Sequence, residues 1–190
     1  AEILIFGKIV GQHASDFSKR LKYIVRSHKV IKNSCEDINS LIKKDEEMVI
    51  PLQHELKELM WNFCGVVKTK DKLNMGLAKI EILKKRFLNI DVRIENDNIN
   101  DLINTLDLKA SLISAESTII SALNRNESRG AHIRKDFPDL NEKNNFNNLI
   151  ILNKDKLEVK QLKSKNVNSK LEKIIDKANK NIYASHKLLE

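Results

Sequence analysis

The longest helical pattern in the chain reads INDLINTLDLKASLISAESTIISALN and runs from Ile99 to Asn124. Apolar side chains recur along it at helical spacing on two separate stripes. The first stripe is Ile99, Leu102, Leu106, Ala110, Ile113 and Ile120, and the second is Leu108, Leu112, Ala115, Ile119 and Ala122. A helix that is apolar on two sides is packed on two sides. We therefore expect this helix to be the central member of a helical bundle.

Two shorter patterns upstream predict the other members of that bundle. Pro51 opens the first, because proline at the first helical position lacks only an N–H that would be unpaired anyway. Gly65 follows this helix where a left-handed C-cap is expected. Thr69 is the predicted N-cap of the next helix, and Asp71 lies in its first turn. The prediction is a mainly α fold with a three-helix bundle of the spectrin-repeat type.

Both ends of the chain predict additional elements. Gly7, Gly11 and Ala14 lie on one helical face, which predicts an N-terminal helix that permits close packing and begins before Ala1. This helical spacing continues to residue 31, whereas residues 34–45 predict a loop with a weak helix. Residues 148–153 and 157–162 predict a short β-hairpin after the bundle. Residues 164–168 read as a linker, and residues 171–189 predict a lysine-rich C-terminal helix.

The composition narrows the class of protein. Of 190 residues, 41% are hydrophobic, 5% aromatic and 32% charged, a balance that suits charged helices with aliphatic stripes. No apolar run approaches the roughly 20 residues that span a bilayer. Cys35 and Cys64 lack metal-ligand spacing, so we expect neither a disulfide framework nor a metal site. We expect the protein to reside in the reducing cytoplasm. A net charge of +8 leaves a basic helical interaction module open, although the lysines are spread over the whole length.

The segment from Asn124 to Pro138 concentrates charges beside a glycine and a proline. His132 with Arg129 and Arg134 could form a carboxylate-binding or proton-transfer group, because arginine offers a planar fork and histidine titrates near neutrality. The alternative is a structural ion-pair and capping cluster. Its members would be Glu127, Arg129, Arg134 and Asp136, arranged around a Gly130 with positive φ at a helix C-cap. No complete active-site motif for nucleotides, metals or hydrolysis is present.

This segment resembles a known signature. Residues 126–138 are similar to the ESRGAHxRxDFP motif in the C-terminal helical domain of succinate dehydrogenase and fumarate reductase flavoproteins. Further resemblances are collinear with it. Residues 52–69, 77–83 and 105–124 resemble the three bundle helices of that family, and residues 2–14 resemble the LVFGRxAGxxA helix that closes its flavin-binding domain. L-aspartate oxidase shares this architecture, but Ala131 and Phe137 are more similar to the signature of the succinate/fumarate branch.

The resemblance implies a function for the full-length protein. It implies binding of FAD and interconversion of a dicarboxylate such as succinate with its unsaturated partner. It also implies that the dinucleotide-binding glycines and the substrate-binding residues precede Ala1. We therefore expect a C-terminal fragment that is not catalytic alone, and we assign no catalytic, cofactor-binding or metal residue in it. Residues 1–45 would end the flavin-binding domain and connect it, residues 46–138 would form the three-helix domain, and residues 139–190 would form a hairpin and terminal extension.

By the same resemblance, the charged segment is a domain-interface motif. Its residues are Glu127, Arg129, Gly130, His132, Arg134 and Asp136. The expected partner is the FAD-binding domain of the same protein, with an iron–sulfur subunit as a further candidate and no nucleic acid. We expect a cytoplasmic location, with peripheral attachment to a membrane through partner subunits left open. Two features depart from the family: Lys68 stands where arginine is usual, and residues after Pro138 match poorly.

Overall fold

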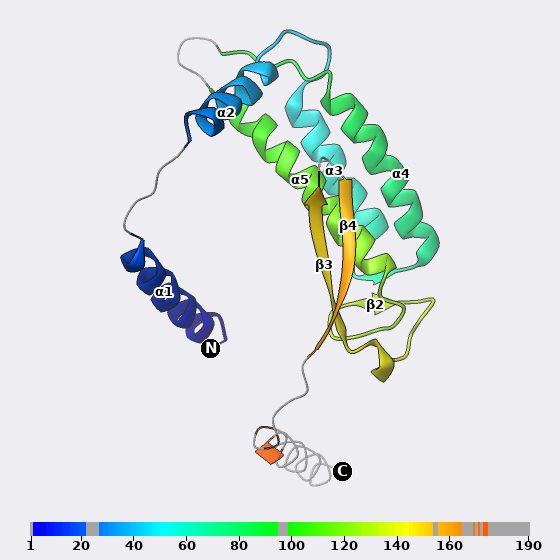
Figure 1. Cartoon of the computed structure of the whole chain (residues 1–190). Helices are drawn as coiled ribbons and strands as arrows, with labels where there is room; N and C mark the ends of the chain where they lie inside the picture. Colours follow the sequence, from blue (N-terminus) through cyan, green and yellow to red (C-terminus); the bar gives the residue numbers. More distant parts are fainter. Residues whose placement is uncertain are drawn as a thin grey trace.

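The computed structural model describes residues 2–21, 27–94, 99–153 and 156–164, together with Ser169, Leu171, Lys173 and Ile174. Within these residues the chain is mainly helical. Helices α3 (Val49–Cys64), α4 (Lys70–Phe87) and α5 (Asn100–Leu123) lie side by side and contact one another in pairs (Figure 1). The predicted three-helix bundle is confirmed.

One face of α5 supplies the centre of the bundle core. All five residues of the second predicted stripe are buried, with Ile119 fully so. The first stripe is different, because Ile99 and Leu106 remain 48% and 40% exposed. Two-sided packing is therefore wrong for the start of the helix. It holds only near the C-terminal end, where Ile113 and Ile120 are half-buried and the hairpin lies against α5.

The helix ends show which local predictions hold. The side chain of Thr69 accepts a hydrogen bond from the backbone N–H of Lys72, so the predicted N-cap of α4 is confirmed. The predicted left-handed cap at Gly65 is wrong, because its φ is −63° and its ψ is −160°. Glycine is needed there for another reason: a Cβ would lie 2.5 Å from the carbonyl oxygen of Trp61. Pro51 is the third residue of α3, still within the first turn, where an N–H has no helical acceptor.

Two further helices precede the bundle. Helix α1 (Glu2–Arg20) confirms the N-terminal helix, and Figure 1 shows it apart from the bundle. For residues 34–45 the sequence predicts a loop with a weak helix. Helix α2 (His28–Leu41) accounts for residues 34–41 and residues 42–45 are irregular, so the helix is longer than expected. Its amphipathic pattern is sufficient for a helix even without a side-chain N-cap. Apolar side chains of α1 such as Ile3 and Leu4 are 89% and 78% exposed.

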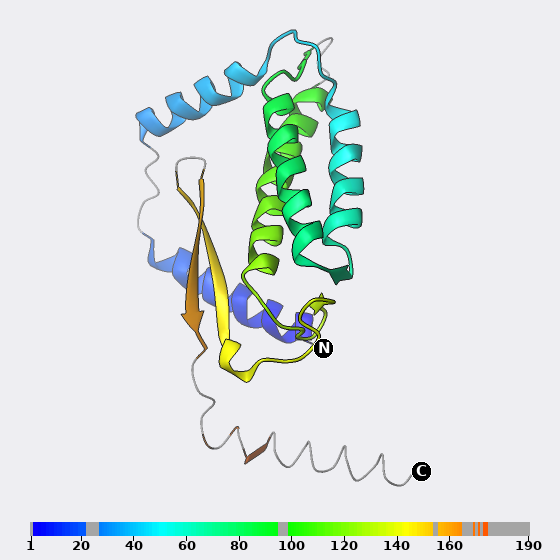
Figure 2. The same cartoon turned by 90° about the vertical axis from the view of Figure 1, so that its right-hand side faces the viewer.

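Two pairs of strands complete the described part. Strand β1 (Val67–Lys68), between α3 and α4, pairs in parallel with β2 (Ile133–Arg134). The predicted hairpin is confirmed by β3 (Phe146–Asn153) and β4 (Lys156–Lys163), which pair antiparallel beside α5 (Figure 2). A short 3-10 helix, η1 (Glu142–Asn144), precedes β3. Most of the predicted linker and C-terminal helix lies outside the described residues, although Ser169, Leu171, Lys173 and Ile174 are helical.

Across the segments that the structure describes, each helix is too short or too polar to span a bilayer.

The orientation of α5 predicts unequal costs for two similar substitutions. Ile119→Ala should lower the free energy of unfolding by about 2 to 5 kcal/mol, because it opens a cavity in the core. Ile103→Ala on the same helix should cost less than about 1 kcal/mol, because Ile103 is 45% exposed. Urea unfolding followed by circular dichroism measures both values. Equal costs would contradict the burial pattern.

Candidate functional site

The segment after α5 turns sharply below the bundle and contains two fully buried charged residues. We call residues 125–138 the corner. Glu127 and Arg134 have no solvent-exposed surface, although burying a charge costs several kcal/mol unless it is paired. The pairing of β1 with β2 fixes the corner against the connection between α3 and α4. The partners of the two buried charges therefore decide what the corner can do.

Arg134 joins two helix ends. Its Nε and Nη2 donate to the two carboxylate oxygens of Asp136, at 2.8 and 2.7 Å. Its Nη1 donates to the carbonyl oxygen of Ala122 at 2.7 Å and of Arg125 at 3.2 Å, at the C-terminal end of α5. Asp136 in turn accepts the backbone N–H of Lys70, at the first turn of α4, at 2.8 Å. Positive charge therefore meets a helix C-terminus and negative charge a helix N-terminus, which is the favourable order for both helix dipoles.

The same arrangement fixes the protonation state of Asp136. The hydrogen bonds from Arg134 hold the pKa of this carboxyl group well below its usual range, and the N–H of Lys70 adds to this effect. Burial acts in the opposite direction but is outweighed. Asp136 is therefore ionised at neutral pH, and the bidentate pair is intact.

Glu127 forms a second cluster. It accepts hydrogen bonds from Arg125 at 2.6 Å and from Arg129 at 3.0 and 3.1 Å. The backbone N–H of Asn141 donates to it at 2.9 Å. Chiefly through Arg129, these bonds lower the pKa of Glu127 to about 2 despite its burial. The buried carboxylate is thus fully partnered, and the cluster connects the corner to the segment before β3.

Gly130 lies in a tight turn of the corner. Arg129 and His132 exchange both backbone hydrogen bonds, at 2.8 and 3.0 Å. The φ of Gly130 is +56°, as expected, but the turn is separate from the helix, whose C-cap is Asn124. No atom lies within 4 Å of a Cβ built there, so the backbone conformation alone requires glycine.

His132 is half-buried beside this turn. Its Nε2 lies 3.2 Å from the carbonyl oxygen of Arg125. Burial is the main reason that its pKa is lowered, and the positive charges of Lys68, Arg134 and Arg125 lower it further. The imidazole is therefore neutral at pH 7, which makes Nε2 the donor to that carbonyl.

The predicted charged residues are thus brought together as ion pairs. Arg129 is paired with Glu127, and Arg134 is paired with Asp136. The guanidinium forks needed for a carboxylate-binding group at His132 are already occupied. Of the two hypotheses for the corner, the geometry matches the structural ion-pair cluster.

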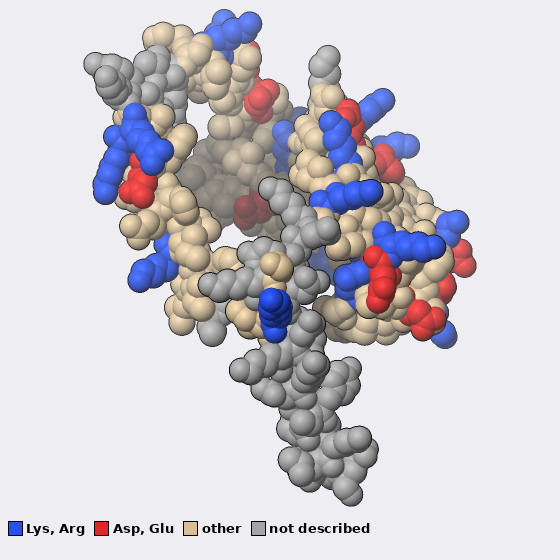
Figure 3. Space-filling model, turned by 60° about the horizontal axis from the view of Figure 1, so that its bottom comes forward, with Lys and Arg blue, Asp and Glu red and all other residues tan. Residues whose placement is uncertain are grey.

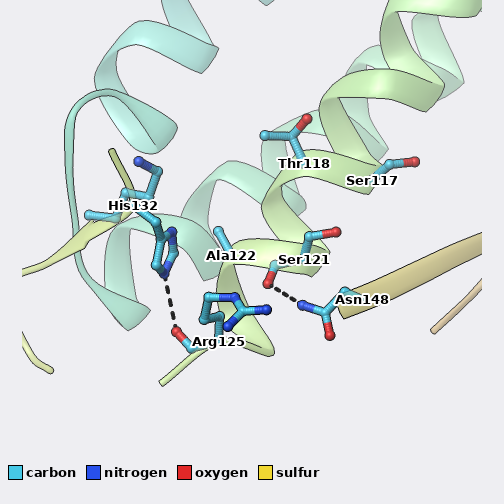
Figure 4. A pocket seen from close by; sticks show the side chains of 8 residues that line it. Ser117, Thr118, Ser121, Ala122, Arg125, His132 and Asn148 are labelled. Atoms are coloured by element: carbon cyan, nitrogen blue, oxygen red, sulfur yellow. Dashed lines mark hydrogen bonds between the residues drawn. The ribbon is translucent and has the colours of Figure 1, made fainter. Parts of the chain in front are cut away.

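A hollow of about 470 Å³ lies beside the corner (Figure 4). It is lined by Lys68, Ser117, Thr118, Ser121, Ala122, Arg125, His132 and Asn148. Sequence reasoning missed this grouping, because its residues come from β1, α5, the corner and β3 and share no local pattern. The only available signal was Lys68 itself, which departs from the expected arginine. Pairing of β1 with β2 places Lys68 opposite Arg134 in the register.

Metal-ligating residues give no further site among the positions that the structure describes. No group of three or more His, Cys, Asp or Glu side chains there is arranged to hold a metal ion. Cys35 is exposed and Cys64 is half-buried, and both are free thiols. Burial raises the pKa of Cys64, which reduces the reactivity of its thiol.

Comparison with known proteins identifies the class. A family profile described as "Fumarate reductase flavoprotein C-term" matches residues 53–180. The three-helix bundle and its corner therefore define a C-terminal helical domain of flavoprotein type. This chain belongs to the family of succinate dehydrogenase and fumarate reductase flavoproteins. The match extends well past Pro138, so the expectation that the tail matches the family poorly is wrong; a hairpin is specified by alternation rather than by a fixed motif.

Curated relatives are about a third identical to this chain over the residues that align. An uncharacterized FAD-dependent oxidoreductase of Methanocaldococcus jannaschii is 33% identical over 143 residues, which cover 75% of this chain and 25% of the relative. The fumarate reductase flavoprotein subunit of Serratia sp. is 32% identical over 72% of this chain and 23% of the relative. L-aspartate oxidase of Acinetobacter baylyi is 33% identical over 56% of this chain and 19% of the relative. The chain spans about a quarter of the length of the curated relatives it matches.

Solved structures confirm the fold. The Sdh1 complex of Mycobacterium smegmatis in its apo form superposes with a TM-score of 0.75 at 21% identity, covering 87% of this chain and 29% of that chain. A quinol fumarate reductase from E. coli gives a TM-score of 0.73 at 23% identity, and the match covers 88% of this chain and 30% of that chain. The helical arrangement is thus shared at low sequence identity.

The pairing of Glu127 predicts a pH-dependent loss of stability. Folding lowers its pKa from 4.5 to about 2, so the ionised form is favoured in the folded state. Its contribution should be complete above about pH 5 and should disappear as the pH falls toward about 2. At pH 7, Glu127→Gln should cost about 2 to 3 kcal/mol, and the cost should shrink on acidification.

Urea unfolding between neutral and acidic pH measures this difference. Glu142→Gln in η1 is the matched control, because Glu142 lies on the surface near the same segment. A cost for Glu127→Gln that stays constant with pH would show that the charge of the carboxylate is not what stabilises the corner.

Proposed function

We propose that this chain is the C-terminal helical part of an FAD-dependent flavoprotein of the succinate dehydrogenase/fumarate reductase type. In this proposal it packs on the flavin-binding domain and is not catalytic alone. The match of residues 53–180 to the C-terminal segment of the family carries the proposal. The corner supports it, because its arginines and carboxylates are committed to one another rather than open to a substrate.

The division into three parts follows from the same proposal. Residues 1–45 end the flavin-binding domain and connect it to the bundle. The exposed apolar side chains of α1 support this assignment, since such a surface is typical of a helix that packs on another domain. Residues 46–138 form the three-helix domain, and its core begins with Val49. Residues 139–190 form the hairpin and the terminal extension.

The corner is the proposed interface with the flavin-binding domain. Its motif residues are Glu127, Arg129, Gly130, His132, Arg134 and Asp136. The buried ion pairs hold the backbone in one conformation, so little conformational entropy would be lost on docking. The corner exposes the apolar side chains of Ile133, at 40%, and Phe137, at 36%, and Leu140 just beyond it is 56% exposed. A rigid surface with apolar contacts and charged surroundings suits a contact between domains.

Cofactor and partners follow from the relatives. One relative is named an FAD-dependent oxidoreductase and another a fumarate reductase flavoprotein subunit. We assign FAD to the full-length protein and its binding to the domain on which the corner docks. The Mycobacterium smegmatis structure is described as a complex, which supports further subunits. We propose that an iron–sulfur subunit is one of them. A cytoplasmic location with peripheral attachment to a membrane through such subunits fits this assembly.

The substrate is proposed to be a dicarboxylate of the succinate/fumarate pair. Relatives named fumarate reductase match over 72% to 73% of this chain, whereas those named L-aspartate oxidase match over 54% to 56%. Aspartate is the second candidate. A nucleic-acid function ranks below both, because on the face that Figure 3 shows acidic side chains lie among the basic ones.

Assays of the isolated chain test whether the active site lies elsewhere. The purified 190-residue chain should not retain FAD and should not oxidise succinate or aspartate. Absorbance of bound flavin and dye reduction measure the two properties. If the chain alone bound one FAD and oxidised succinate, the proposal that its partner domain holds the active site would be wrong.

A chimera tests the docking role directly. In it, this chain replaces the matching quarter of the Methanocaldococcus jannaschii relative. The chimera should purify with FAD, whereas Ile133→Lys at the exposed corner should lower its flavin content. Leu149→Lys on the hairpin is the control, because its side chain is similarly exposed, at 42%. Equal flavin content in both variants would argue against the corner as the interface.

A further inference from the structure

The hollow beside the corner carries positive charge that nothing nearby balances. Lys68 is half-buried, and its Nζ lies 3.3 Å from the carbonyl oxygen of Val66. Among the described residues, no carboxylate lies within ion-pair distance of this ammonium group. This ammonium group is exposed, and none of the residues that line the hollow carries a negative charge. The site would therefore gain from a negative partner.

The acidic groups of the corner cannot supply that partner. Glu127 is shared by Arg125 and Arg129, so two cations already face one carboxylate. Asp136 is committed to Arg134 and to a backbone N–H of α4. The positive potential reaches His132, whose pKa is depressed partly by Lys68, Arg125 and Arg134.

The walls of the hollow also provide hydrogen-bond donors. The hydroxyls of Ser117 and Thr118 are occupied, because each donates to a backbone carbonyl of α5 at 2.7 Å. The hydroxyl of Ser121 has no hydrogen-bond partner among the described residues. In Figure 4, Ser121 and Arg125 lie between His132 on one side and Asn148 on the other. The lining of the hollow thus offers two available donors, the ammonium group of Lys68 and the hydroxyl of Ser121.

We propose that this hollow binds a carboxylate, and that its occupant is an Asp or Glu side chain presented by the flavin-binding domain. The hollow is an open depression at the edge of the corner, whereas sites for small molecules enclose most of their ligand. A side chain that arrives with a docking surface needs no such enclosure. This inference rests on the proposed docking function and adds the chemistry of one contact: a charge-assisted pair with Lys68.

Titration of the 190-residue chain with a capped glutamate, N-acetyl-glutamic acid amide, tests the site by NMR at low salt. The ring signals of His132 and the backbone signal of Ser121 should shift saturably. The isosteric capped glutamine should leave both unchanged. Because loss of a charge-assisted bond is costly, Lys68→Met should weaken glutamate binding by about fivefold or more. Lys135→Met, which removes a nearby exposed charge outside the hollow, should retain it.

Each other outcome would overturn the inference. Absence of saturable shifts with the capped glutamate would show that the hollow is not a carboxylate site. Equal weakening by Lys68→Met and Lys135→Met would show nonspecific attraction to a basic surface. Tighter binding of inorganic phosphate with the same shifts would assign the hollow to a small oxyanion instead. Loss of flavin content in the chimera is a separate readout, so failure of docking and failure of this site are distinguishable.

Discussion

The buried guanidinium group of Arg134 is the contact on which the corner depends. A single planar fork binds both oxygens of Asp136 and also reaches the carbonyl groups at the end of α5. Asp136 extends the connection to the first turn of α4. Because lysine cannot match this bidentate geometry, the position requires arginine. The two helices are thus joined at their ends by charges that complement their dipoles, in addition to the apolar core between them.

Glu127 organises the other half of the corner. It draws Arg125 and Arg129 together and orders the segment that leads to the hairpin through Asn141. Arg125 also donates to the backbone of Phe146 and lies over its ring, 4.8 Å from the centroid. The hairpin is therefore connected to the corner by the same side chain that lines the hollow. Stability and the proposed docking surface thus share residues, so a surface substitution is the cleaner probe of docking.

Local patterns predicted the elements well where one face is buried. The patterns of α3 and α4 and the second stripe of α5 specify the bundle, and the apolar runs at residues 148–153 and 157–162 specify the hairpin. The first stripe of α5 led to the incorrect prediction that the whole helix is packed on two sides, because apolar spacing does not reveal whether a neighbouring element covers the stripe. The position of Gly65 suggested a left-handed helix cap, which was also incorrect. Glycine is required at this position because a Cβ would clash with the backbone of Trp61.

The site was predictable only in part. The charged residues could be named from the sequence, and their family resemblance identified the class of protein. Their pairing could not be derived, because Asp136 selects Arg134 through a turn and the N–H of Lys70 lies 66 positions away. The hollow requires contacts among four segments that are distant in sequence. Such groupings depend on tertiary structure, which no spacing rule encodes.

The free energy of unfolding of Arg134→Met tests the central claim most directly. Methionine fills much of the space but leaves Asp136 and the carbonyl of Ala122 without their donor. We predict a loss of about 3 to 5 kcal/mol, the cost of breaking a buried ion pair by removing one partner. A variant within about 1 kcal/mol of the unmodified chain, the range of exposed ion pairs, would contradict the central role of Arg134.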